Sequence, residues 1–277
     1  MKRIVTVQDI SCVGKCSLTV ALPIISAMGV ETAVIPTAVL STHTAFKGFT
    51  FRDLTEDITP ILDHWKKEKI SFDAIYTGYL GSFRQLELMK KMFGDFKNDG
   101  TLIFVDPCMA DNGNLYPGFT KEFAAAMAKL ACLADIIVPN MTEASFMLNI
   151  PYKDSGYDLK YVENMLVELA ALGAKKVILK GVSFESKKIG VMCYDSATKT
   201  FSSYFHEKLP FSFHGTGDIF ASVCAGAILR GFSEEKAVAL AADFVVRAIK
   251  ATVKNQKHNW YGVDFESEIP FLVGSLG

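Results

Sequence analysis

Short apolar runs and longer amphipathic stretches alternate along most of the chain. Runs of four to six apolar residues are typical of buried strands, whereas apolar positions that recur every three or four residues are typical of helices. The runs predict strands at residues 3–8, 32–36, 74–77, 101–105, 136–138 and 176–179. The amphipathic stretches predict helices at residues 15–28, 55–68, 83–97, 120–133, 158–172, 217–229 and 234–254. This alternation indicates an α/β fold with a central, mostly parallel sheet that is flanked by helices on both faces.

The alternation of strands and helices changes after residue 181. Residues 190–194 and 200–205 flank a polar turn at 195–199, which predicts an antiparallel hairpin at the edge of the sheet. The residues after 254 have no clear period and are expected to form an irregular tail. We find no linker-like composition and no internal repeat, and therefore expect a single domain over residues 1–277.

Composition narrows the classes of function. Half of the 277 residues are hydrophobic and the formal net charge is −1, so bulk charge favours neither nucleic acid nor an anionic membrane as a partner. No apolar run approaches the roughly 18 residues of a membrane span. The apolar start at residues 4–7 is too short for a signal peptide. The six cysteines lack paired spacing and are expected to be reduced thiols in a cytoplasmic protein.

One stretch, residues 213–220, combines two glycines with an acidic residue at the start of a predicted helix. Gly215 and Gly217 flank Thr216 and allow a tight turn that directs backbone N–H groups toward one point. A helix N-terminus is also a favourable position for a phosphate or for developing negative charge. Asp218 would repel an anion there, unless its task is to take a proton from an attacking hydroxyl group. The alternative is that Asp218 only caps the helix.

Polar residues follow the carboxyl end of each predicted parallel strand, where ligands bind in open α/β sheets. In chain order they are Asp9, Ser11, Ser41, His43, Thr44, Tyr79, Asp106, Asp111, Asn140, Glu143 and Lys180. Each one alone also fits a structural role, such as a helix cap at Asn140. Together they supply carboxylates for Mg²⁺ and a lysine for a transferring phosphoryl group, which is the chemistry of a phosphotransferase.

Two other nucleotide-binding motifs are excluded. The segment Gly14-Lys15-Cys16 is similar to the end of a P-loop, but that motif needs glycine where this chain has Asp9. It also needs serine or threonine where this chain has Cys16. No G-x-G-x-x-G sequence follows the first strand, so the dinucleotide-binding fingerprint is absent as well.

The Gly215–Asp218 block resembles the signature of the ribokinase-like superfamily. The closest resemblance is to the pyridoxal/pyridoxamine (vitamin B6) kinases and runs over nearly the whole chain. The residues that carry it are Gln8-Asp9-Ile10-Ser11 with Gly14, Leu40-Ser41-Thr42-His43-Thr44, Thr77-Gly78-Tyr79-Leu80-Gly81, Asp106-Pro107-Cys108-Met109-Ala110-Asp111 and Val138-Pro139-Asn140-Met141-Thr142-Glu143. The resemblance implies ATP-dependent phosphorylation of the 5′-hydroxymethyl group of pyridoxal, pyridoxamine or pyridoxine, as in vitamin B6 salvage.

The resemblance also implies a role for each matching residue. Asp218 would be the catalytic base, and Gly215, Thr216 and Gly217 would form the anion hole. Mg²⁺ and its waters would be held by Asp106, Asp111 and Glu143. The phosphates of ATP would face Asn140 and Lys180, beside Asp111 and Glu143. The pyridine ring would be lined by Asp9, Ser11, His43, Thr44 and Tyr79. Members of this branch are commonly homodimers, so the resemblance implies a homodimer here. The sequence leaves open whether the reaction also requires a monovalent cation.

Some residues depart from the vitamin B6 pattern. Many pyridoxal kinases place a serine where this chain has Asp9, and in this aspartate the chain resembles the hydroxymethylpyrimidine kinases instead. Val138 stands where some relatives have a threonine near the nucleotide. Only residues 9–14 separate the first strand from its helix, so we expect no separate lid domain at that point. A hydroxymethylpyrimidine kinase and a catalytically silent vitamin B6-binding protein remain alternatives. Cys12 and Cys108 fall in loops expected at the site, with packing or substrate contact as the two interpretations.

Overall fold

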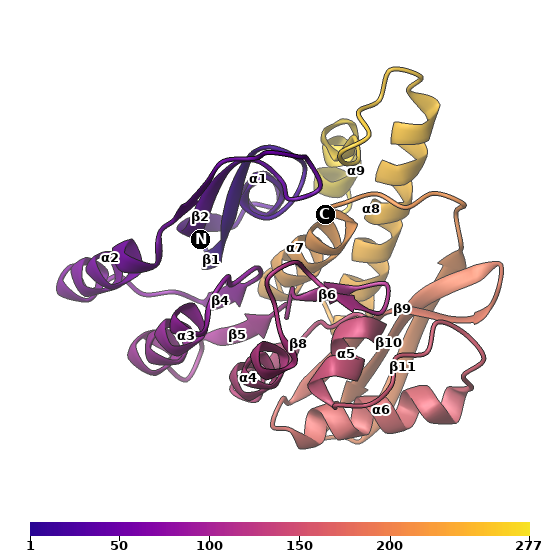
Figure 1. Ribbon diagram of the computed structural model, residues 1–277, viewed down its shortest axis with the longest axis horizontal. Helices are drawn as coiled ribbons and strands as arrows, with labels where there is room; N and C mark the ends of the chain where they lie inside the picture. The colour runs from indigo at the N-terminus through magenta and orange to yellow at the C-terminus, as the bar shows by residue number, and fades with distance from the viewer. The chain divides into compact units, whose positions relative to one another are not determined.

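The structure is a computed structural model that describes residues 1–277 and divides into two compact units. The first unit comprises Met1–Gly78 and Leu209–Gly277, and the second comprises Tyr79–Lys208. In Figure 1 the first unit therefore carries both ends of the colour scale, and the second carries its middle. The single domain over residues 1–277 remains a prediction.

The strands of the first unit follow the order β4-β1-β2-β3. They are β1 (Arg3–Val13), β2 (Glu31–Thr42), β3 (Phe51–Asp53) and β4 (Ala74–Thr77). β1 pairs in parallel with β2 and β4, whereas β3 is antiparallel to β2. The predicted ends of the first two strands at residues 8 and 36 are wrong, since pairing resumes after a register shift between Gln8 and Ile10. A local irregularity of this kind lets polar residues continue a strand.

Two helices of the first unit, α1 (Leu18–Ala27) and α7 (Thr216–Leu229), consist mainly of apolar residues. The others are α2 (Thr55–Lys67), α8 (Glu234–Lys254), a 3₁₀ turn (Phe265–Glu268) and α9 (Ile269–Gly274). α7 is buried from Ile219 to Ala227 and packs against α1 and α8 (Figure 1). A Cβ atom on Gly226 would lie 2.6 Å from the sulfur of Met28, so glycine allows α1 and α7 to pack closely. The prediction of an irregular tail after residue 254 is wrong for residues Ile269–Gly274, which form α9.

The strands of the second unit follow the order β5-β8-β9-β10-β11. They are β5 (Leu102–Val105), β8 (Ile136–Ile137), β9 (Lys176–Glu185), β10 (Lys188–Asp195) and β11 (Thr200–Glu207). β5, β8 and β9 are parallel, and β9, β10 and β11 form antiparallel pairs. The structure thus confirms the predicted edge hairpin. A separate small hairpin, β6 (Ala110–Asp111) with β7 (Asn114–Leu115), was not predicted because two-residue strands carry no period.

The helices of the second unit begin at polar caps. They are α3 (Phe83–Phe96), α4 (Lys121–Ala131), α5 (Met141–Met147) and α6 (Leu159–Ala171). Their N-cap side chains, on Ser82, Thr120, Asn140 and Asp158, each accept a hydrogen bond from the first turn, as strong N-cap residues do. None of the helices of either unit combines the length and the apolar character that crossing a bilayer requires.

Candidate active site

The N-terminus of α7 begins with a glycine that no other residue could replace without strain. Gly215 is the N-cap and has φ 80° and ψ −3°, in the left-handed region. A Cβ atom at this position would collide with the carbonyl oxygen of Lys15. The hydroxyl of Thr216 donates to the carbonyl oxygen of Phe213 at 3.2 Å and closes the turn. The positive end of a 14-residue helix follows this turn, and it favours negative charge.

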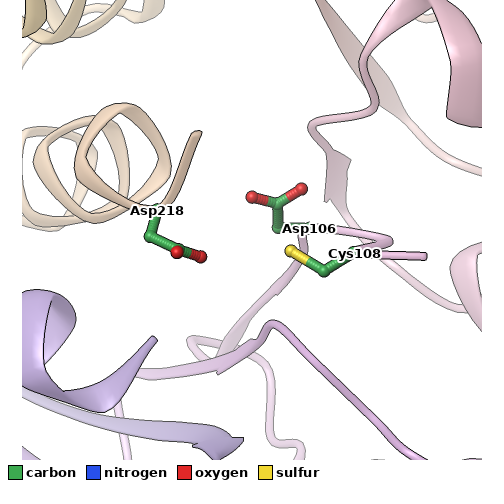
Figure 2. A group of neighbouring side chains, drawn as sticks. All are labelled: Asp106, Cys108 and Asp218. Carbon is green, nitrogen blue, oxygen red and sulfur yellow. The ribbon is translucent and has the colours of Figure 1, made fainter. Parts of the chain in front are cut away.

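Asp218 lies in the first turn of α7, and its side chain projects from the helix (Figure 2). Because Gly215 is the N-cap, the alternative interpretation that Asp218 serves only as the helix cap is wrong. The Oδ2 atom of Asp218 instead accepts a hydrogen bond from the backbone N–H of Ser17 at 3.0 Å. One oxygen of the carboxylate is therefore held by a neutral backbone donor.

Asp9 and Ser11 are both buried near the end of β1 and belong to one hydrogen-bonded group. The Oδ1 atom of Asp9 accepts from the hydroxyl of Ser17 at 2.5 Å, and its Oδ2 atom accepts from the hydroxyl of Ser11 at 3.0 Å. Burial raises the pKa of Asp9, while the two serine hydroxyls oppose this shift. Burial and the nearby carboxylate of Asp218 also raise the pKa of Cys16, so this thiol stays protonated and is not a nucleophile.

His43 is buried and uses both ring nitrogens within the protein. Its Nε2 atom lies 2.9 Å from the carbonyl oxygen of Tyr261, and its Nδ1 atom accepts from the backbone N–H of Ala45 at 3.2 Å. These partners require the neutral ring with a proton on Nε2, and burial lowers the pKa of His43 accordingly. The ring of Phe46 packs edge-on at 5.0 Å, whereas Thr44 is exposed. His43 thus fixes the loop after β2.

Asp106 follows β5 in the second unit and forms a buried ion pair. The Nζ atom of Lys180 donates to both carboxylate oxygens of Asp106, at 2.9 and 3.0 Å. Figure 2 shows the side chains of Asp106 and Cys108 on the segment that follows this strand. The side chain of Asp106 is 1% exposed and that of Lys180 is 14% exposed. Lys180 is therefore paired and largely covered.

Glu143 completes this buried cluster from the first turn of α5. Its Oε2 atom accepts from the backbone N–H of Asn140 at 2.8 Å, and its Oε1 atom accepts from the backbone N–H of Met109 at 3.3 Å. Burial raises the pKa of Glu143 to about 8 and also raises the pKa of Asp106. Burial alone would lower the pKa of Lys180, but the two carboxylates outweigh it and raise that pKa. A bound cation would favour the ionised form of Glu143.

The remaining predicted residues of the second unit are arranged differently. The Asn140 side chain caps α5 through Oδ1 and donates from Nδ2 to the carbonyl oxygen of Ala110, so it joins the small hairpin to the helix. Asp111 is exposed at the turn of that hairpin, and its carboxylate accepts two hydrogen bonds from Asn112. Tyr79 is partly exposed and its ring lies 5.6 Å from that of Phe119.

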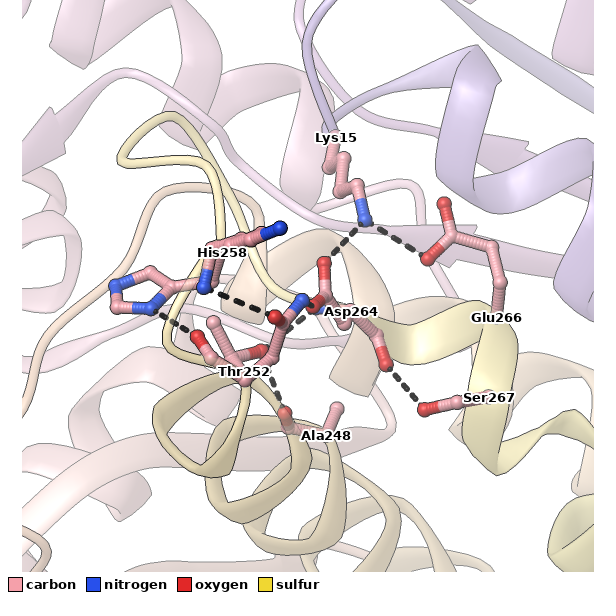
Figure 3. A network of polar contacts seen from close by, with 9 residues as sticks. Lys15, Ala248, Thr252, His258, Asp264, Glu266 and Ser267 are labelled. Atoms are coloured by element: carbon pink, nitrogen blue, oxygen red, sulfur yellow. Dashed lines mark hydrogen bonds and ion pairs between the residues drawn. The ribbon is translucent and has the colours of Figure 1, made fainter.

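Sequence reasoning missed Ser17 and the contacts of Lys15. The Lys15 ammonium binds the carboxylates of Asp264 and Glu266, each at 2.9 Å, and Figure 3 shows this network. The backbone N–H of Asp264 donates to the hydroxyl of Thr252 on α8 at 2.7 Å. A cysteine and a serine after Gly14-Lys15 carried no signal beyond the rejected P-loop, because their partners are distant in sequence.

Comparison with known proteins shows the family to which the chain belongs. The family model described as phosphomethylpyrimidine kinase matches residues 22–262. A phosphomethylpyrimidine kinase-like protein from Bacteroides thetaiotaomicron, crystallised with pyridoxal, is 38% identical with a TM-score of 0.93, covering 98% of this chain and 95% of that one. Pyridoxal kinase from Lactobacillus plantarum is 30% identical with a TM-score of 0.90, covering 99% and 98%.

Among curated relatives, pyridoxine kinase from Bacillus subtilis is 31% identical over 191 residues. This match spans 65% of this chain and 65% of that one, slightly less than two thirds. The strand pairing and these similarities together confirm the ribokinase-like α/β fold predicted from the sequence. The chain belongs to the phosphomethylpyrimidine kinase family.

Proposed function

We propose that this protein uses ATP to phosphorylate the 5′-hydroxymethyl group of pyridoxal, pyridoxine or pyridoxamine. The observation that carries the proposal is the start of α7. A left-handed glycine opens an anion-favouring helix end, and a carboxylate in the first turn accepts a hydrogen bond from the Ser17 N–H. This combination suits a base that must act next to a phosphate.

The proposed reaction is an in-line transfer. Asp218 takes the proton from the substrate alcohol while the alcohol oxygen forms a bond to the γ-phosphorus of ATP. The bond between that phosphorus and the bridging oxygen breaks, and ADP leaves. Gly215, Thr216 and Gly217 present the helix N-terminus to the negative charge that develops during transfer.

Asp106, Glu143 and Lys180 are proposed to manage charge on the nucleotide side. Mg²⁺ prefers oxygen ligands and retains waters, and the buried carboxylates of Asp106 and Glu143 offer this chemistry. Since Lys180 binds both oxygens of Asp106, contact through water fits better than direct ligation. When bound, Mg²⁺ would neutralise phosphate charge. Asp111 and Asn140 remain proposed contacts for Mg²⁺ and the ATP phosphates.

The ring-binding residues are proposed to be Asp9, Ser11, His43, Thr44 and Tyr79. Asp9 is the acidic member and has serine hydroxyls on both oxygens, so its carboxylate has a fixed orientation toward a polar ring substituent. Because both nitrogens of His43 are used, we assign it to shaping the loop rather than to a hydrogen bond with the ring. A homodimer and a cytoplasmic location are also part of the proposal.

A vitamin B6 ring is favoured over a pyrimidine by two relatives of high coverage. The Bacteroides thetaiotaomicron protein was crystallised with pyridoxal, and the Lactobacillus plantarum protein is a pyridoxal kinase. Hydroxymethylpyrimidine is the second candidate substrate, favoured by the name of the family and by Asp9. A silent vitamin B6-binding protein is less well supported, because binding alone needs no carboxylate beside an anion site.

The test is an ADP-release assay with Mg·ATP and four alcohols in parallel, namely pyridoxal, pyridoxamine, pyridoxine and hydroxymethylpyrimidine. We expect kcat/KM to be highest for one of the three vitamin B6 alcohols. Turnover mainly of the pyrimidine would assign the second candidate. Binding of pyridoxal without ADP release from any alcohol would contradict the kinase proposal and support the silent binding protein.

A further inference from the structure

Ser17 departs from the usual behaviour of a helix N-cap in two ways. It precedes α1 with φ 50° and ψ −133°, a conformation that glycine adopts far more readily than serine. An N-cap serine normally accepts a hydrogen bond from the first turn of its helix, yet the Ser17 hydroxyl makes no such bond. Both departures need an explanation outside the helix.

The two donors of Ser17 supply that explanation. Its hydroxyl donates to Oδ1 of Asp9 at 2.5 Å, and its backbone N–H donates to Oδ2 of Asp218 at 3.0 Å. Asp9 and Ser17 are both buried, so water cannot easily replace the serine hydroxyl. A strained backbone is retained where surrounding contacts determine it, which is common at functional sites.

We infer that Ser17 is a positioning residue that fixes the carboxylates of Asp9 and Asp218 relative to each other, one through its hydroxyl and the other through its backbone N–H. This inference rests on the proposed function, in which Asp9 binds the ring and Asp218 takes the proton from its alcohol group. The hydroxyl bond to Asp9 fixes the Ser17 peptide, and this peptide aims its N–H at Asp218. Ring binding and base orientation are thereby set by the same residue.

A glycine substitution separates this role from a purely structural one. Ser17→Gly removes the hydroxyl and relieves the backbone, whereas Ser17→Ala removes the hydroxyl and keeps the strain. Ser26→Ala on the exposed side of α1 is the matched control. We expect both Ser17 variants to lose about tenfold in kcat and to raise the KM for the alcohol, with an unchanged KM for ATP. We expect the Tm of Ser17→Gly to be no lower than that of Ser17→Ala.

Two outcomes would overturn the inference. One is a Ser17→Gly variant with the kcat and KM values of the wild type. The other is a loss of activity that follows Tm across the variants, which a structural role alone would produce. Each variant is compared with the wild type on the alcohol that the wild type uses best, so a wrong choice of ring does not affect the result.

A measurement without turnover keeps the test separate from the proposed function. An NMR titration of the Asp9 carboxyl in the ligand-free protein should give a higher pKa in both Ser17 variants and no change in Ser26→Ala, since the lost hydroxyl bond favours the ionised form. An unchanged Asp9 pKa would contradict the inference. If the proposed function itself is wrong, the wild type and all variants lack turnover alike, while the titration still decides the contact.

Discussion

Two groups of buried carboxylates in this protein are stabilised by different chemistry. In the first unit, Asp9 and Asp218 form a serine-held pair, in which Asp9 accepts from the hydroxyls of Ser11 and Ser17 and Asp218 accepts from the backbone N–H of Ser17. In the second unit, Asp106 and Glu143 form a lysine-held pair around the ammonium of Lys180. Neutral donors orient a carboxylate without cancelling its charge, whereas a lysine cancels it. The first arrangement suits proton transfer, and the second suits charge balance and stability.

The largest effect is expected from removing the proposed base in the serine-held pair. In Asp218→Asn the amide oxygen can still accept from the Ser17 N–H, so the fold should be retained. The amide cannot take a proton, and general base catalysis typically contributes about 10²–10⁴-fold. We expect kcat to fall about 10³-fold in the ADP-release assay with little change in Tm.

The exposed Asp63 on α2 provides the control for this variant. Asp63→Asn removes one carboxylate as well, but should keep the kcat of the wild type. A kcat within threefold of the wild type for Asp218→Asn would contradict the assigned role of the base.

The second largest effect is expected in the lysine-held pair, and it should appear in stability. Lys180→Met leaves Asp106 buried without its counter-charge, and breaking a buried pair in this way typically costs about 3–5 kcal/mol. Urea denaturation should show a loss of about 3 kcal/mol. The double variant Asp106→Asn with Lys180→Met should recover at least half of it. A double variant as unstable as the single one would show that the pair does not carry the effect.

The sequence was sufficient for local features of both groups. The helix cap predicted at Asn140 is confirmed, and α7 follows from its glycines and apolar run. The pairing of Lys180 with Asp106 joins residues 74 positions apart, and that of Lys15 with Asp264 joins residues 249 apart. No local period encodes such contacts, because they depend on how the chain folds back on itself.

The extended ends of β1 and β2 show a second limit. Residues 9–13 and 37–42 contain polar or turn-forming residues, so their pattern predicts loops. In the structure the parallel pairing of β1 with β2 continues as far as Val13 and Thr42. Tertiary pairing therefore overrides local propensity at these two strand ends, where Asp9 and Ser11 lie.

Near the serine-held pair, a pH effect on stability is expected from His43. Burial lowers the pKa of His43 below the ordinary value of 6.5. The neutral ring therefore contributes stability above pH 6.5 that is lost as the pH falls through the lowered pKa. Protonation also removes the acceptor for the Ala45 N–H, which costs about 1–2 kcal/mol.

The pH dependence of Tm for the wild type and His43→Gln is the measurement. Glutamine does not titrate, so the decline below pH 6.5 should be shallower in the variant. His206 is partly exposed on β11 and serves as the control, because His206→Gln should follow the wild type. Identical curves for all three proteins would exclude His43 as the source of the decline.

The smallest effect is expected where lysine pairs with carboxylates near the surface. Lys15 is largely covered, but Glu266 is 55% exposed and Asp264 is 21% exposed. Water screens such pairs, and exposed ion pairs contribute about 0–1 kcal/mol. Lys15→Met should therefore cost only about 0.5–1 kcal/mol in urea denaturation, far less than Lys180→Met. The difference would identify burial as the cause, since Lys15 pairs with two carboxylates and Lys180 with the single, buried carboxylate of Asp106. Asp264→Asn should lose more stability in urea denaturation than Glu266→Gln, because Asp264 is less exposed and also accepts a hydrogen bond from Asn255. Equal losses for Lys15→Met and Lys180→Met would mean that burial does not distinguish the two lysines.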